Sequence, residues 1–365
     1  MSDSVLFEER ATASGHRIGI ARLNSPRSLN SLSRTMISLL EDKLTEWEQD
    51  DGIVCVWLEG EGERAFCAGG DIVEMYRSMT PLGEANPFIE DYFASEYRLD
   101  YLLHVYEKPL ICWAHGVVMG GGMGLMQGAS QRVVTEKSRL AMPEITIGLY
   151  PDVGGSWFLN RTPGKTGLFA GLTGVHLNAG DALFMGLADV CIPSDQHDAV
   201  LASLAAATFD GDETQDAAVV HRCLRAAAAP APASPVRERF DEINQACDHA
   251  TLPEVAAALL ALKGDDEWFQ RAASTFERGC AQTAWLVWEQ LQRARYLSLA
   301  EVFRMEWCMS VQCAMHADFR EGVRALLIEK DGNPAFRYTS IEDVPREYIE
   351  GFFANPLPHH PLADL

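Results

Sequence analysis

The feature that most constrains the fold is a glycine triplet, Gly120, Gly121 and Gly122, which follows an apolar run at residues 109–114. A short apolar run bounded by turn signals is typical of a buried strand. Glycines between such a strand and a helix carry no side chain, so their backbone N–H groups can approach a ligand closely. The triplet therefore predicts a ligand-binding strand-to-helix turn, with a plain glycine-rich turn as the alternative.

A dinucleotide-binding turn is excluded by direct comparison with its pattern. The motif G-x-G-x-x-G, started at Gly120, requires glycine where Leu125 stands, and started at Gly122 it requires glycine where Gln127 stands. The motif fails in both frames, so the triplet serves another purpose.

A second glycine pair stands in a comparable place. Gly69 and Gly70 follow a strand end at residues 65–68 and precede a helix that we expect to start at Asp71. Asp is a favoured N-cap, so Asp71 has a purely structural interpretation. Two such turns could each direct one backbone N–H at the same carbonyl oxygen and so form an oxyanion hole.

Three acidic residues are candidates for chemistry. Glu144 and Asp152 each follow a proline on an apolar background, where a carboxyl group has a shifted pKa or a partner. Their alternative is an ordinary surface position. Glu96 lies on a helix expected over residues 88–107, and a lone Glu on an amphipathic helix is most often solvated.

Alternating strands and helices extend to about residue 193, which predicts an α+β (layered α/β) fold. We expect a core domain over residues 1–210, a Pro/Ala-rich linker over 211–236 and a helical C-terminal region over 237–365. The chain after Asn333 is expected to be an extended tail.

Composition excludes several classes of function. A net charge of −22 argues against nucleic acid as a partner, and an anionic substrate must be met by locally placed cations or helix N-termini. The nine cysteines form no C-x-x-C pair, which indicates reduced thiols in the cytoplasm. No segment is long and apolar enough for a membrane span or a secretory signal, and no His/Cys pattern predicts a metal site.

The order and spacing of these segments resemble the crotonase (enoyl-CoA hydratase/isomerase) superfamily. The segments that carry the resemblance are residues 23–32, 65–72, 115–122, 143–144 and 172–174. The resemblance implies a ββα spiral core that binds an acyl-CoA thioester. It also implies that the N–H groups of Gly70 and Gly121 form the oxyanion hole.

The same resemblance assigns further positions around the thioester. Gly69, Gly120 and Asp71 flank the oxyanion donors as substrate-binding positions. The backbone at Ala68 would hold the CoA adenine, and the turn around Arg27 would lie near the CoA phosphates. Crotonases often form trimers, so a homo-oligomer is possible.

One departure from the superfamily bears on the reaction. Hydratases use two glutamates to add water across an enoyl double bond, and the second matches Glu144. The first falls two residues after the glycine triplet, where this chain has Gly124, which cannot transfer a proton. A hydratase or isomerase therefore stays the alternative, with a non-catalytic acyl-CoA-binding protein behind it.

Segments along nearly the whole chain are similar to the 3-hydroxyisobutyryl-CoA hydrolase branch of the superfamily. These segments are residues 95–97, 141–155, 318–331 and 352–356. The resemblance implies hydrolysis of a short-chain 3-hydroxyacyl-CoA, as in valine degradation, with no cofactor apart from the CoA of the substrate.

The hydrolase resemblance also gives roles to the acids. It implies that Glu144 is the general base for water or a nucleophile that passes through an anhydride. It implies that Asp152 binds the 3-hydroxyl or assists proton transfer, and that Glu96 orients the substrate or water.

Overall fold

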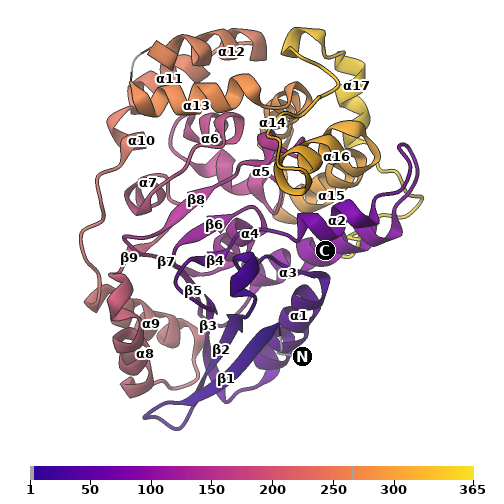
Figure 1. Cartoon of the computed structure of the whole chain (residues 1–365). Coiled ribbons are helices and arrows are strands. Elements are labelled where there is room, and N and C mark those ends of the chain that lie inside the picture. Colours follow the sequence, from indigo (N-terminus) through magenta and orange to yellow (C-terminus); the bar gives the residue numbers. More distant parts are fainter. Residues whose placement is uncertain (1–3, 265) are drawn as a thin grey trace. The chain divides into compact units, whose positions relative to one another are not determined.

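The strands belong to two sheets, and most of them come in consecutive pairs with one member in each sheet. The larger sheet has the order β1-β2-β3-β5-β7-β9, antiparallel between β1 and β2 and parallel from β2 onward. Its strands are β1 (Val5–Ala11), β2 (Arg17–Leu23), β3 (Ile53–Gly60), β5 (Leu110–Ala114), β7 (Gln131–Val134) and β9 (Val190–Cys191). The smaller sheet has the order β4-β6-β8, from β4 (Ala65–Cys67), β6 (Val117–Met119) and β8 (Arg139–Ala141). Strand pair and helix thus repeat along the chain (Figure 1).

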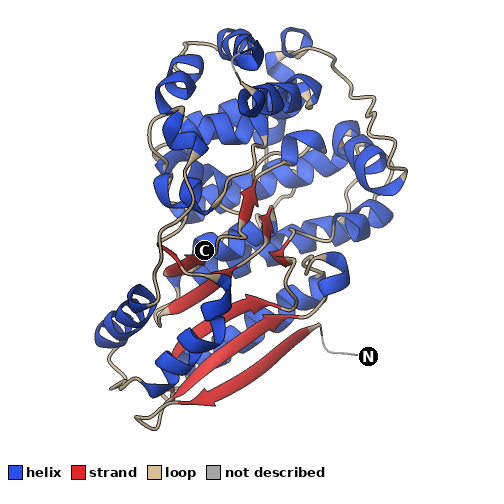
Figure 2. Ribbon diagram, turned by 60° about the vertical axis from the view of Figure 1, so that its left-hand side comes forward, coloured by secondary structure: helices blue, strands red, loops and turns tan. Residues whose placement is uncertain are grey.

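The computed structural model describes residues 4–264 and 266–365, which form two interleaved units. The first unit takes the described residues up to Gly70, then Leu99–Leu140 and Leu177–Ser234. The second takes Asp71–Arg98, Ala141–His176 and Pro235–Leu365. The strands gather in the first unit, whereas the second unit is built of helices (Figure 2).

The helices of the first unit flank its sheets. They are α1 (Arg34–Gln49), α4 (Gly121–Gly128), α7 (Ala179–Phe184), α8 (His197–Ala206) and α9 (Glu213–Ala226). Helix α1 begins where Ser33 caps the amide of Met36 at 3.2 Å, a common way to satisfy a free N–H at a helix start.

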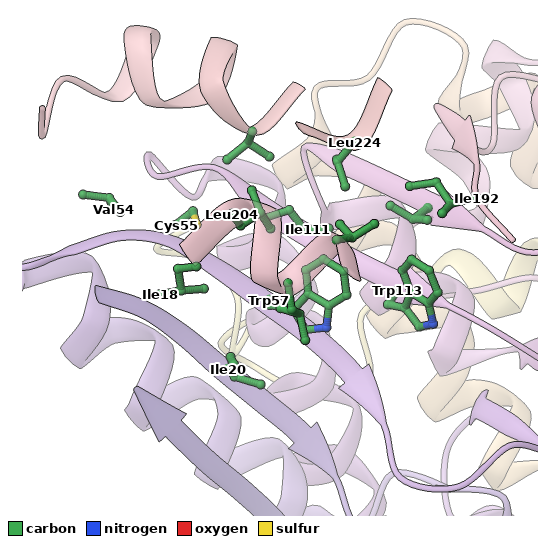
Figure 3. Packing of buried hydrophobic residues seen from close by; sticks show 14 of the residues in the cluster. Ile18, Ile20, Val54, Cys55, Trp57, Ile111, Trp113, Ile192, Leu204 and Leu224 are labelled. Atoms are coloured by element: carbon green, nitrogen blue, oxygen red, sulfur yellow. The ribbon is translucent and has the colours of Figure 1, made fainter. Parts of the chain in front are cut away.

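The core of the first unit lies between the larger sheet and helices α8 and α9. Ile18 and Ile20 of β2, Trp57 of β3 and Trp113 of β5 are buried there against Leu204 and Leu224 (Figure 3). The two indole rings are stacked with centroids 5.5 Å apart. Parallel strands covered in this way are rich in apolar residues, as residues 53–58 of β3 show.

The second unit contains the helices that follow β4 and β8 and the whole chain from Pro235 onward. These helices are α2 (Ile72–Ser78), α5 (Gly155–Phe158), α6 (Thr166–Thr173), α10 (Pro235–Glu238), α11 (Phe240–Cys247), α12 (Leu252–Ala261), α13 (Glu267–Arg278), α14 (Ala281–Ala294), α15 (Leu299–Met315), α16 (Ala317–Val323) and α17 (Arg346–Glu350). Helix α3 (Pro87–Val105) spans the division at Arg98.

The strands expected at residues 65–68 and 109–114 and the helix expected to start at Asp71 are present. The extended tail is wrong in part, because α17 and two short 3₁₀ segments, Ile341–Asp343 and Gly351–Phe353, interrupt it. Residues 211–236 contain helix α9 before an extended stretch at 228–234. The predicted domain boundaries stay a prediction.

Candidate active site

The two glycine turns lie side by side in the first unit. A Cβ added at Gly69 would stand 3.5 Å from the backbone nitrogen of Gly121, and one added at Gly122 would stand 2.3 Å from the carbonyl oxygen of Cys67. Gly69 and Gly120 both have positive φ, 105° and 48°, which favours glycine. The structure therefore brings together the two turns that the sequence singled out.

The amides of Gly70 and Gly121 are free to bind a ligand. Gly121 is the first residue of α4, so its N–H has no partner within the helix. Gly70 pairs with Leu32 in a parallel bridge, in which the amide of Leu32 donates a hydrogen bond to the carbonyl of Gly69. Neither amide donates a hydrogen bond to a described residue, as an oxyanion hole requires.

The residues expected to bind CoA lie around the first turn. The amide of Ala68 donates to the carbonyl of Leu29 at 3.0 Å, which joins Ala68 to the turn that carries Arg27. Arg27 is exposed on the 3₁₀ segment Pro26–Ser28. Asp71 caps α2, its carboxylate accepting the amide of Glu74 at 3.0 Å, in line with its structural interpretation.

Glu144 begins the 3₁₀ turn Glu144–Thr146 directly after β8 and Pro143. Glu144 is only 4 % exposed, and its Oε2 has no hydrogen-bond partner among the described residues. The backbone four residues further on is tightly packed, because a Cβ added at Gly148 would stand 2.4 Å from the carbonyl oxygen of Asp318. The structure thus places a carboxyl group in a buried position with an unused oxygen.

Asp152 lies in the turn before α5 and is also buried. Tyr97 of α3 donates a hydrogen bond to its Oδ2 at 2.7 Å. Two consecutive left-handed residues follow, Val153 with φ 52° and Gly154 with φ 85°. Positive φ at a β-branched residue is strained, and such strain persists only where the surroundings hold it.

Glu96, on α3 beside Tyr97, is buried rather than solvated. Its Oε1 has no hydrogen-bond partner within residues 4–264 and 266–365. The interpretation of Glu96 as a surface residue of an amphipathic helix is therefore wrong.

The three carboxyl groups interact electrostatically within the second unit. Burial raises the pKa of Glu144 and of Glu96 well above the usual value, and the charge of Asp152 raises both further. Burial also raises the pKa of Asp152, to about 6, against the hydrogen bond from Tyr97, which lowers it. Carboxyl groups with such raised pKa values can exchange protons near neutral pH.

The sequence did not predict the roles of three further residues at this site. They are Tyr97 as a hydrogen-bond donor, and Glu306 and Ser310 on α15. Glu306 accepts hydrogen bonds from the amides of Gly154 and Ser156, at 2.7 and 2.8 Å. A signal for Glu306 was available, since it stands alone among apolar residues in a helix with a buried face.

The first unit holds a buried carboxylate of a different kind at the end of β3. Glu59 accepts hydrogen bonds from Arg22 at 2.6 Å, from Trp57 at 2.8 Å and from His197 at 2.5 Å. Burial raises the pKa of Glu59, but the hydrogen bond and charge of His197 outweigh it and lower the pKa to about 2. A cavity of about 540 Å³ adjoins this group, also lined by Trp113, His115 and Lys137.

Within the described residues, no group of three or more His, Cys, Asp or Glu side chains could hold a metal ion. No helix among them is long and apolar enough to cross a membrane.

The chain belongs to the enoyl-CoA hydratase/isomerase family, which it matches over residues 18–353. The fold is that of a crotonase, as the sequence predicted. Solved structures agree: a carnitinyl-CoA dehydratase from Mycobacterium thermoresistibile has 33 % identity and a TM-score of 0.88, with all of both chains covered. An enoyl-CoA hydratase from Rhodobacter sphaeroides 2.4.1 has 32 % identity and a TM-score of 0.83, covering 97 % of this chain and 98 % of that one.

More particularly, the chain is similar to curated 3-hydroxyisobutyryl-CoA hydrolases. The mitochondrial enzyme of Xenopus tropicalis is 34 % identical, covering 92 % of this chain and 86 % of the relative. 3-Hydroxyisobutyryl-CoA hydrolase 1 of Arabidopsis thaliana is 33 % identical over 96 % and 91 %. The human mitochondrial enzyme is 31 % identical over 96 % and 89 %.

Proposed function

We propose that this protein hydrolyses a short-chain 3-hydroxyacyl-CoA thioester, 3-hydroxyisobutyryl-CoA above all, to the free acid and CoA. The observation that carries the proposal is the buried set of carboxyl groups in the second unit, Glu96, Glu144 and Asp152, in a chain similar to curated hydrolases along almost its whole length.

In the proposed reaction, the N–H groups of Gly70 and Gly121 bind the thioester oxygen. Negative charge grows on this oxygen as the tetrahedral intermediate forms, and fixed donors stabilise it without having to reorganise. Removal of one such donor typically costs about 3 kcal/mol of barrier. The two unused amides support this role.

Glu144 activates the attacking water as general base or attacks the thioester itself as nucleophile. In the first route the carboxylate takes a proton from water while the new C–O bond forms, and the thiolate of CoA then leaves. In the second route the carboxylate forms an anhydride with the acyl group as the C–S bond breaks and the CoA thiolate leaves, and water then hydrolyses the anhydride to the free acid and the carboxylate of Glu144. The unused Oε2 leaves an acceptor for the proton of the water, and the raised pKa of Glu144 makes its carboxylate a stronger base than an ordinary glutamate.

The two other acids act on the acyl chain and on water. Asp152 accepts the hydrogen of the 3-hydroxyl group, which gives preference for hydroxylated substrates. Glu96, with its unused Oε1, orients the substrate or the water. CoA binds through the backbone at Ala68, with Arg27 near its phosphates.

A hydratase or isomerase is the second candidate, because the two solved relatives at about a third identity carry the titles dehydratase and hydratase. The position that bears on the choice is Gly124, which lies buried in α4 where the superfamily's hydratases carry a glutamate. Without that group, addition of water across a double bond lacks one of its two proton carriers.

The proposal extends to the setting of the enzyme. The nine cysteines form no disulfide in the described part of the chain, which fits a reducing compartment, and we place the protein in the cytoplasm although several relatives carry the word mitochondrial in their names. The reaction uses no cofactor apart from the CoA of its substrate, and a homo-oligomer is possible.

The test is release of free thiol from 3-hydroxyisobutyryl-CoA, 3-hydroxypropionyl-CoA and crotonyl-CoA, measured side by side. The proposal predicts release of CoA from the two hydroxyacyl esters and none from crotonyl-CoA. Loss of the enoyl absorbance of crotonyl-CoA without thiol release would instead identify a hydratase. Tight binding of all three esters with no conversion would identify an acyl-CoA-binding protein.

A further inference from the structure

Asp152 lies in a turn whose backbone conformation is unfavourable for the residues that form it. The turn contains Val153 in the left-handed region, and its internal backbone bond runs from the amide of Gly155 to the carbonyl of Asp152 at 2.7 Å. A β-branched residue with positive φ is a genuine outlier, so contacts from elsewhere must hold this conformation.

Helix α15 supplies such a contact through Glu306. Its two carboxyl oxygens accept one hydrogen bond each from the amides of Gly154 and Ser156, which flank the start of α5. Glu306 is fully buried. A side chain with one bond on either side of Gly155 fixes the path of the turn that carries Asp152.

One helical turn further along α15, Ser310 reaches the other side of Asp152. Its Oγ lies 2.6 Å from the hydroxyl of Tyr97, and Tyr97 in turn donates to Asp152 Oδ2 at 2.7 Å. Ser310 also lies 2.8 Å from the hydroxyl of Tyr150, which gives its own hydrogen to the carbonyl of Glu306 at 2.5 Å. Ser310 and Glu306 are four residues apart and so share one face of the helix.

We infer that Tyr97, Ser310 and Glu306 are positioning residues that hold Asp152 and thereby set the preference of the enzyme for acyl chains with a 3-hydroxyl group. Tyr97 binds Oδ2 of this carboxylate, and on the proposed function the substrate hydroxyl donates to the same carboxylate. The inference rests on the proposed function, and it gives helix α15 of the C-terminal region a part in substrate selection.

The electrostatic surroundings of Asp152 make this support necessary. Among the described residues, six titratable groups interact with Asp152. They are Glu96 and Tyr97 on α3, Glu144 on the turn after β8, Tyr150 two residues before Asp152, and Glu306 and Cys313 on α15. None of these groups is a cation. The hydrogen bond from Tyr97 is the side-chain contact that lowers the pKa of Asp152 against its burial.

The test compares kcat/KM for 3-hydroxyisobutyryl-CoA with kcat/KM for isobutyryl-CoA between pH 5 and 9. The ratio of the two values cancels the ionisation of Glu144, which both substrates need. In wild type we expect the ratio to rise as Asp152 ionises, since a charged acceptor binds a hydroxyl more strongly. In Tyr97→Phe we expect the ratio at pH 7 to fall about tenfold and its midpoint to move to higher pH.

Ser310→Ala should change the ratio in the same direction by a smaller factor, because Tyr97 keeps its bond to Asp152. Tyr106→Phe is the matched control: it deletes another buried tyrosine hydroxyl, whose partner is the carbonyl of Leu44 at 2.7 Å. The control should leave the ratio and its midpoint at wild-type values.

An unchanged ratio and midpoint in both Tyr97→Phe and Ser310→Ala would overturn the inference while the proposed function stands. Absence of thiol release by wild type would overturn the proposed function. In that event, the ¹³C signal of the Asp152 carboxyl group still tests the positioning: a titration midpoint that Tyr97→Phe does not move would overturn it.

Discussion

Glu59 and Glu144 are buried to the same extent, 3 % and 4 % exposed, yet their pKa values move in opposite directions. Glu59 is surrounded by donors and cations in the first unit. Glu144 in the second unit has an unpaired oxygen and the negative charge of Asp152 nearby. Burial alone therefore does not make a carboxyl group reactive. What distinguishes the candidate active site is that the protein leaves its carboxyl groups uncompensated.

The difference has a direct energetic meaning. A compensated carboxylate stabilises the folded state at neutral pH, because its pKa is lower there than in the unfolded chain. An uncompensated one destabilises it, because folding makes its ionisation harder. The same residue type thus serves stability in one unit and, on our proposal, chemistry in the other.

The largest expected effect is on turnover. Glu144→Gln should lower kcat for thiol release by about 10³-fold, within the usual contribution of an acid–base group, while the affinity for the CoA ester changes little. Thiol release and ligand competition on the same sample measure both. Glu136→Gln, a surface change beside Ser194, is the control and should have no effect on kcat. Equal loss of turnover and binding would remove the role assigned to Glu144.

Glu59→Gln should do the opposite. It leaves His197 and Arg22 without their buried partner, and we expect the free energy of unfolding at pH 7 to fall by about 3 kcal/mol. Wild type should lose the same contribution as pH falls from about 4.5 toward 2, because the folded carboxylate is then protonated. Urea unfolding curves measure the effect. A stability equal to that of wild type would show that His197 and Arg22 do not stabilise the ionised form of Glu59.

His197→Gln should weaken the same cluster by about 2 kcal/mol. Burial lowers the pKa of His197, but its hydrogen bonds to Glu59 and Asp198 outweigh this and raise the pKa above the ordinary value. The stabilisation is therefore complete below pH 6.5 and declines as pH rises through the raised pKa. Unfolding curves at pH 6 and pH 9 should show a larger difference from wild type at pH 6, and the reverse order would contradict this assignment.

The smallest effect expected is on substrate preference. Asp152→Asn removes the charge that accepts the 3-hydroxyl hydrogen, so kcat/KM for 3-hydroxyisobutyryl-CoA should fall about tenfold. The value for isobutyryl-CoA should stay close to wild type. A parallel loss for both esters would assign Asp152 to the chemical step rather than to recognition.

The sequence predicted what depends on local pattern. The strand, glycine turn and helix around Gly121 follow from an apolar run and residues without side chains, and the helix start at Asp71 follows from capping. The apolar background singled out Glu144 and Asp152, and the family resemblance gave them roles. These features lie within short segments, where sequence neighbours are also spatial neighbours.

The burial of Glu96 and the role of Glu306 could not be predicted in the same way. The negative charge that raises the pKa of Glu96 belongs to Asp152, which lies 56 residues further along the chain. The amides that donate to Glu306 lie about 150 residues before it. A helical pattern shows that one face is buried, but it does not show what packs there. The cluster around Glu59 was missed for the same reason, since His197 comes from α8.

The most direct test of the contrast is the pH dependence of the free energy of unfolding of Glu144→Gln relative to wild type. A raised pKa of Glu144 means that the unfolded chain releases this proton first, so wild type loses stability as pH rises above the ordinary value of about 4.5. The variant lacks this loss, and its stability relative to wild type should therefore increase steadily above that pH. A difference that is constant or decreases with pH would mean that Glu144 is compensated like Glu59, and would contradict the account.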